Sequence, residues 1–156
     1  MRRRKADIKE ILPDPKYSSR LVAKFVNICM YEGKKTVAEN IVYGAFELLK
    51  QKTQEESGLK AFNKAIDNAR PKLEVKPRRV GGATYQVPVE VTTPRGQSLA
   101  MRWIRDIARV KKGKPMVNKL ADELLSAYKN EGAAIKKRDD THKMAEANRA
   151  FAHLRW

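Results

Sequence analysis

The sequence has only one cysteine and two histidines, which excludes several common kinds of site. A single cysteine, Cys29, cannot form an internal disulfide or a cysteine-based zinc site. Its apolar neighbours predict a small buried side chain rather than a reactive thiol. His142 and His153 stand alone in the sequence, so neither a metal centre nor a catalytic triad is expected.

Long apolar runs are also missing. No uncharged stretch approaches the length that a membrane span requires. The basic run over residues 2–5 resembles the start of an export signal, but charged residues at positions 7, 9 and 10 interrupt the apolar segment that should follow. We therefore expect a cytoplasmic protein that does not act at a membrane.

Motifs of enzymes are absent as well. The stretch Gly33-Lys34-Lys35-Thr36 superficially resembles a phosphate-binding loop, but Ile28 occupies the place of its first glycine and helices rather than a strand precede it. The neighbouring carboxylates of Asp139 and Asp140 follow basic residues and belong to no recognisable pocket. We expect no enzyme and no cofactor.

Acidic residues are scarce relative to basic ones. The chain has 18 Asp and Glu against 34 Lys and Arg, a formal net charge of +16. A compact domain with this excess repels itself unless a polyanion neutralises it. Nucleic acid is the favoured partner, ahead of an anionic membrane surface or an acidic protein, because each neutralised phosphate releases a counterion.

The apolar residues predict one domain over residues 1–156, mainly α-helical. Residues 1–17 form an extended basic arm, because Pro13 and Pro15 forbid a continuous helix. Six helices follow from apolar periodicity and capping residues. We expect them from Ser18 or Ser19 to Gly33, from a Thr36–Glu39 capping box onward, from Ser57 to Pro71, from Thr93 to Val110, from Pro115 to Gly132, and from Ala133 to about Ala150. Residues 150–156 are expected to be a mobile tail.

The apolar period changes from helical to alternating over residues 72–91, which predicts a β-hairpin. Gly81 and Gly82 accept the backbone angles of its tight turn. Pro77 and Pro88 require strand positions without a ladder hydrogen bond. The predicted fold is therefore a six-helix, bundle-like body with a protruding, isolated two-stranded β-hairpin.

Positive charge is concentrated on one face of the fourth predicted helix. Advancing about 100° per residue places its cations on one arc, with Trp103 on the opposite, core side. These cations are Arg95, Arg102, Arg105, Arg109 and Lys112. An ordinary solvated face mixes charges of both signs, as the fifth helix does with Lys119 and Asp122. The charge pattern of the fourth helix therefore predicts an RNA-binding face, and an ordinary solvated face is the alternative.

Other cations cluster on the arm, on the hairpin and at the ends of elements. Arginine suits RNA because its planar fork grips phosphate and stacks on bases. The expected RNA contacts here are Arg2, Arg3, Arg4, Lys5, Lys34, Lys35, Lys72, Lys76, Arg78, Arg79, Lys111, Lys114, Lys136 and Lys137. Met116 could touch a base, pack in the core or start a helix, and Tyr85 could stack on a base or pack in the core.

Several segments are specific enough to indicate a family. They are Arg79–Val91 (RVGGATYQVPVEV), Met144–Trp156 (MAEANRAFAHLRW), Met1–Arg4, Ile11–Lys16 (ILPDPK), Gly33–Lys35 and Leu99–Trp103 (LAMRW). Together they closely resemble the family of small-subunit ribosomal protein seven, bacterial type. The resemblance covers essentially the whole chain. Pro77 and the stretches 52–58 and 110–119 depart from the family pattern.

The resemblance implies a primary binder of small-subunit ribosomal RNA that nucleates assembly of the subunit head. It implies small-subunit ribosomal proteins nine and eleven as neighbours and, in some members, binding of the protein's own messenger RNA. It also places one group of residues near the exit-site transfer RNA. These are Val80, Gly81, Gly82, Tyr85, Arg149, Arg155 and Trp156.

Two other functions remain as alternatives. Consecutive short helices with a basic fourth helix could form a DNA-binding regulator, and the same amphipathic helix could lie on a membrane surface. A ribbon with scattered basic loops suits irregular RNA better than a single recognition helix does. Binding to folded ribosomal RNA is therefore the favoured hypothesis.

Overall fold

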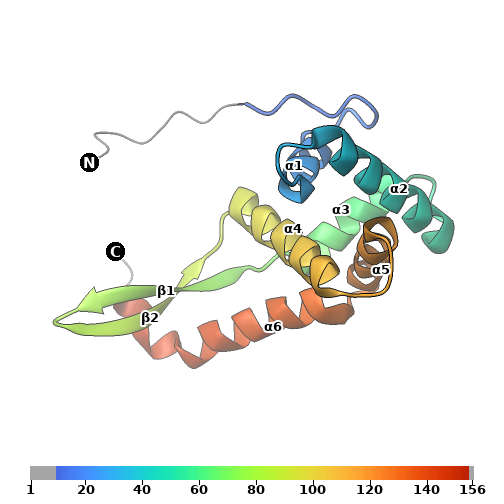
Figure 1. Ribbon diagram of the computed structural model, residues 1–156. Helices are drawn as coiled ribbons and strands as arrows, with labels where there is room; N and C mark the ends of the chain where they lie inside the picture. The colour runs from blue at the N-terminus through green and yellow to red at the C-terminus, as the bar shows by residue number, and fades with distance from the viewer. Residues whose placement is uncertain (1–9, 155–156) are drawn as a thin grey trace.

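Six α-helices and a β-hairpin make up the protein, as the computed structural model of residues 10–154 shows (Figure 1). The elements are α1 (Arg20–Cys29), α2 (Lys35–Thr53), α3 (Gly58–Ala69), β1 (Leu73–Val80), β2 (Ala83–Glu90), α4 (Thr93–Val110), α5 (Met116–Tyr128), α6 (Gly132–Ala147) and the 3₁₀-helix η1 (Arg149–Leu154). The predicted mainly α fold with a protruding hairpin is confirmed.

The core lies where α5 packs against α2, α3, α4 and α6. Three fully buried phenylalanines join the first three helices: the Phe62 ring centroid lies 5.0 Å from that of Phe25 and 4.8 Å from that of Phe46. Each such side chain stabilises the fold by roughly 1.5–3 kcal/mol through burial. Gly58 starts α3 directly against Phe46, where a Cβ atom would lie 2.5 Å from the backbone oxygen. This close approach allows α2 and α3 to share one core.

Several predicted helix ends differ from the observed ones. The first helix ends at Cys29, and Gly33 lies instead in the following turn, with φ +73°. The predicted capping box is wrong, because α2 already begins at Lys35 and has no side-chain cap. Gly132 does not close α5, which ends at Tyr128, but is the first residue of α6. The Ser57 cap is confirmed: its hydroxyl accepts a hydrogen bond from the Leu59 amide.

The hairpin pairs β1 with β2 in the register Leu73–Glu90 to Val80–Ala83. This register leaves Gly81 and Gly82 as a two-residue turn, and their φ angles of +56° and +91° suit the left-handed conformations that such turns require. Both glycines have open space around them. The predicted turn is confirmed.

The hairpin is not isolated, which corrects one expectation. Helix α6 extends from the body alongside β1, and η1 packs against β2 (Figure 1). The Phe151 ring of η1 lies 5.2 Å from the Tyr85 ring of β2. Residues 150–154 are therefore folded onto the ribbon and are not a mobile tail, because apolar contacts with the hairpin replace the packing that α6 alone could not supply.

The segment before α1 is fixed to the body by a buried carboxylate. Asp14 is only 3% exposed. Its carboxylate accepts hydrogen bonds from the backbone amides of Lys16 and Tyr17 and, at 2.7 Å, from the Tyr43 hydroxyl. The described part of the predicted arm thus ends in a turn that is attached to α2.

Candidate nucleic-acid interface

Helix α4 has one buried face and one exposed, basic face. Trp103 is 9% exposed, so its predicted place in the core is confirmed. Arg102, the preceding residue, is exposed. Within residues 10–154, no carboxylate lies within ion-pair distance of Arg102, so its full charge is available to a ligand.

Two further arginines of α4 contact the end of α1. Arg105 donates a hydrogen bond to the Ile28 carbonyl, and Arg109 donates one to the Cys29 carbonyl, both at 3.1 Å. These bonds satisfy carbonyls that a helix end leaves without partners. Burial raises the pKa of the Cys29 thiol to about 12, although both arginines oppose this. Cys29 is partly buried and, at neutral pH, protonated.

A buried carboxylate at the root of the hairpin engages two of the predicted cations. Glu74 is 7% exposed. Arg95 donates from Nε to both of its oxygens at 2.8 Å, and the Lys76 ammonium lies 3.2 Å from Oε1. Arg95 and Lys76 therefore hold β1 to the start of α4 and present less free charge than Arg102.

The loop between α4 and α5 carries three predicted lysines in different surroundings. The Lys111 ammonium lies 2.6 Å from Glu123, which is 1% exposed, and Lys114 lies 3.4 Å from Asp122. Lys112 is exposed with no ion-pair partner in the described chain. Met116 is half-buried against the core.

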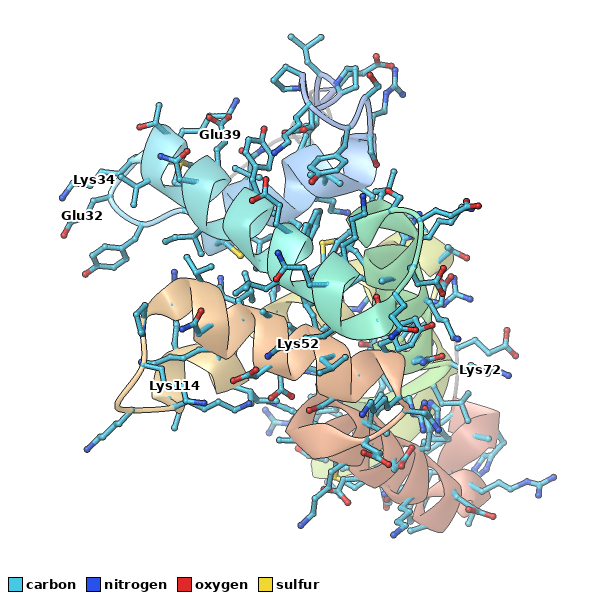
Figure 2. All side chains as sticks on the ribbon, turned by 90° about the vertical axis from the view of Figure 1, so that its right-hand side faces the viewer. Glu32, Lys34, Glu39, Lys52, Lys72 and Lys114 are labelled. Carbon is cyan, nitrogen blue, oxygen red and sulfur yellow. The ribbon has the colours of Figure 1, made fainter. Side chains whose placement is uncertain are left out.

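The turn between α1 and α2 lies on the same side of the body as this loop. Figure 2 shows Lys34 and Lys114 at one side and Lys72 at the opposite side. Lys34 pairs with Glu32 at 3.0 Å and Lys35 with Glu39 at 3.8 Å; all of these residues are exposed except Glu39, which is half-buried. Exposed pairs of this kind are weak and exchange readily for phosphate.

The remaining described cations lie at the hairpin and α6. Arg78 and Arg79 lie on β1 just before the exposed turn formed by Gly81 and Gly82, with Val80 at its start. The Lys137 ammonium lies 5.8 Å above the Trp103 ring, and Lys136 is exposed. The predicted cations thus form two groups: one around α4 and the two neighbouring turns, and one along the hairpin and α6.

A cavity of about 480 Å³ lies among the hairpin root, α6 and η1, which line it together. Lys72 and Arg149 line it together with His142. The Lys72 backbone amide donates a hydrogen bond to Nε2 of His142 at 2.9 Å. Burial lowers the pKa of His142, with help from Arg138 and Lys72 and against Asp139. Its neutral form therefore attaches α6 to the start of β1.

Six predicted residues lie outside the described part of the chain: Arg2, Arg3, Arg4, Lys5, Arg155 and Trp156. Conversely, sequence reasoning missed Tyr31, which is 68% exposed next to Arg109. An aromatic residue just beyond the apolar stripe of a helix, in a glycine-containing turn, was the available signal.

Two kinds of site are absent from residues 10–154. No group of three His, Cys, Asp or Glu side chains there is arranged to hold a metal ion. No helix in the same range is long and apolar enough to cross a membrane.

The chain is similar to known proteins along its whole length. Residues 1–149 match the family described as ribosomal protein S7p/S5e. The small ribosomal subunit protein uS7 of Thermotoga petrophila is 59% identical over 156 residues, which cover 100% of both chains. That of Fervidobacterium nodosum is 62% identical over the same length, and that of Phenylobacterium zucineum is 58% identical over 155 residues, 99% of each chain.

These similarities extend over the whole chain. They confirm the family resemblance inferred from the sequence motifs. Proteins of this family are structural parts of the ribosome rather than enzymes, as the sequence also predicts. The chain belongs to the family of ribosomal protein S7p/S5e.

Proposed function

We propose that this protein, a structural component of the small ribosomal subunit, binds the RNA of that subunit directly and nucleates assembly of its head. The observation that carries the proposal is the exposed Arg102, which has no carboxylate partner in the described chain although the helix is rich in charge. A guanidinium of this kind can bind a phosphate group through two parallel hydrogen bonds. Lys112 and the weakly paired Lys34 and Lys35 extend the positive surface around it.

The hairpin supports a second contact, with the exit-site transfer RNA. Its turn, Gly81-Gly82, is exposed and has no side chains, so an RNA backbone can approach it closely. Arg79 supplies charge beside the turn. The folded η1 brings Arg149 to the same arm. In this proposal the hairpin and the C-terminal end act together.

The remaining partners follow from the family alone. We include small-subunit ribosomal proteins nine and eleven as neighbours, the protein's own messenger RNA as a regulatory target, and the bacterial cytoplasm as the location. The proposed RNA surface is defined residue by residue, so it is the part that mutagenesis tests first.

The salt dependence of RNA affinity tests the proposal. We would measure binding to an in vitro transcript of small-subunit ribosomal RNA at several salt concentrations for the wild type, Arg102→Gln and Lys50→Gln. Lys50 is exposed on α2 and lies outside the proposed surface. Each variant loses one positive charge, so a difference between them reports the position of that charge. Arg102→Gln should weaken binding and reduce the slope of log K against log salt by about one unit, because one phosphate contact is lost. Lys50→Gln should keep the wild-type slope.

Equal slopes for the two variants would contradict the proposed surface. Competition with random duplex DNA addresses the alternative of a DNA-binding regulator. Preference for that DNA over the ribosomal transcript would overturn the assignment to RNA, because folded RNA offers unpaired bases and a shape that duplex DNA lacks.

A further inference from the structure

Tyr31 is an exposed aromatic residue in the middle of a basic surface. Its side chain is 68% exposed, and the Arg109 guanidinium carbon lies 5.9 Å from the ring centroid. Arg109 is in turn held by the Cys29 carbonyl. A single exposed aromatic residue is common, but Tyr31 and the exposed Val37 border the same hollow, and a contiguous exposed apolar patch is typical of a contact surface.

The ring borders a small hollow with apolar walls. The hollow has a volume of about 160 Å³. It is lined by Cys29, Tyr31, Lys34, Val37, Ala38 and Ile41. An apolar cavity of about 150 Å³ accommodates one aromatic ring. Val37 is itself 53% exposed, so the apolar surface continues beyond the hollow.

Cations surround the hollow. Lys34 lines it, Lys35 begins the adjacent helix α2, and Arg109 lies against Tyr31. Glu32 is the acidic residue nearest in the sequence, and Lys34 pairs with it at 3.0 Å. The combination of a flat aromatic face, an apolar recess and flanking positive charge matches a nucleotide, which has a planar base and an anionic phosphate.

We propose that Tyr31 and the hollow beside it bind one unpaired base of the RNA, stacked on the tyrosine ring, while Arg109 and Lys34 contact the adjoining phosphates. This inference rests on the proposed RNA-binding function and assigns a specific subsite to it. Paired bases are excluded, because a base in a helix presents only its edge and cannot lie flat on the ring.

A protein segment is the other candidate occupant, and the charge argues against it. An apolar peptide would bring no anion to Arg109 or to Lys34 and Lys35, whose pairs with Glu32 and Glu39 are weak. RNA can satisfy both parts of the site, because its phosphates neutralise the cations and its base fills the hollow. Arg109 beside the tyrosine also places a planar guanidinium next to the proposed base, where it can bind the adjoining phosphate.

Two substitutions of Tyr31 test the inference in the full chain. Tyr31→Leu keeps an apolar residue but removes the ring, and it should weaken binding to the small-subunit ribosomal RNA transcript by roughly fivefold or more, because base stacking is lost. The salt slope should not change, since no phosphate contact is removed. Tyr31→Phe should bind like the wild type, because the ring alone is needed.

Crosslinking locates the contact. A transcript containing 4-thiouridine is irradiated in the complex, and the crosslinked residues are identified by mass spectrometry. We expect a crosslink in the tryptic peptide 25–34 that is present in Tyr31→Phe and lost in Tyr31→Leu. Equal urea midpoints of the two variants would show that both fold normally.

The outcomes separate the inference from the proposed function. If Arg102→Gln reduces the salt slope while Tyr31→Leu binds as tightly as the wild type, RNA binding stands and the base subsite is wrong. If neither substitution affects binding, the proposed function itself fails. If Tyr31→Leu impairs only incorporation into subunits reconstituted with the other small-subunit proteins, a protein segment occupies the hollow and the inference is overturned.

Discussion

Arg109 of α4 donates a hydrogen bond at 3.1 Å to the carbonyl of Cys29, the last residue of α1. The last turn of α1 contains no basic residue of its own, so Arg105 and Arg109 supply the positive charge that favours a helix C-terminus. Two arginines that the sequence assigns to a binding face therefore also connect two helices. Within residues 10–154, Arg102 donates no such hydrogen bond to another helix.

This difference predicts separate effects on stability. Arg109→Gln should lower the free energy of unfolding by about 1 kcal/mol, a value reduced for solvent screening because the side chain is exposed. Arg102→Gln should leave it unchanged. Urea unfolding followed by circular dichroism measures both. Equal unfolding midpoints for the two variants would show that the bond to Cys29 contributes nothing to stability.

Glu123 joins three elements and should be the most sensitive carboxylate of the fold. One of its oxygens accepts a hydrogen bond from Lys111, and the other accepts one from the Ala134 amide at 3.2 Å. Glu123→Ala should cost about 3 kcal/mol, because it leaves a cation and a buried amide without partners. Glu131→Ala is the matched control, because it also removes a glutamate carboxylate but at an exposed position. It should change the unfolding midpoint little. Similar losses for both variants would refute the role of Glu123.

His142 should make stability depend on pH. Burial lowers its pKa below the ordinary value of 6.5, so below that pH the unfolded chain binds the proton more readily than the folded chain. The contribution of His142 is complete above pH 6.5 and is lost as pH falls through the folded-state pKa. The stability advantage of the wild type over His142→Gln should therefore shrink between pH 7.5 and about 5. His153→Gln, at an exposed site, is the control, and a constant difference across this range would contradict the prediction.

The contact between Tyr85 and Phe151 should restrain the hairpin. An aromatic pair of this kind contributes roughly 0.5–1.5 kcal/mol beyond its buried area. Phe151→Ala should therefore increase amide hydrogen exchange in β2 by about two- to tenfold, without affecting the core helices. Met144→Ala removes an exposed apolar side chain of α6 and serves as the control. Unchanged exchange in Phe151→Ala would mean that η1 does not stabilise the ribbon.

Local patterns predicted most elements of the fold. Apolar periodicity identified all six α-helices, the alternation around Val87 identified the strands, and Gly81-Gly82 fixed the turn. These features depend on residues that are close in sequence. The early end of α1 did not follow, because its carbonyls are satisfied by Arg105 and Arg109, which are 77 and 80 residues away.

The candidate site was predictable in location but not in detail. A helical wheel places Arg95 and Arg102 on one face, yet only the folded chain brings Glu74 to Arg95 and, among the described residues, no carboxylate to Arg102. The fold of residues 149–154 was missed because their apolar partners lie on the hairpin, far away in sequence. Tyr31 was missed for the opposite reason, since an aromatic next to a helix resembles a core residue until its exposure is known.

The support of the hairpin by α6 has a mechanical consequence. This helix has 16 residues and spans about 24 Å, so it acts as a rigid strut between the outer arm and the body. Its inner end is anchored by the hydrogen bond that the Ala134 amide donates to Glu123. Farther along the helix, His142 connects it to the start of β1. A force applied at the tip of the arm would therefore be transmitted through α6 to the core of the body.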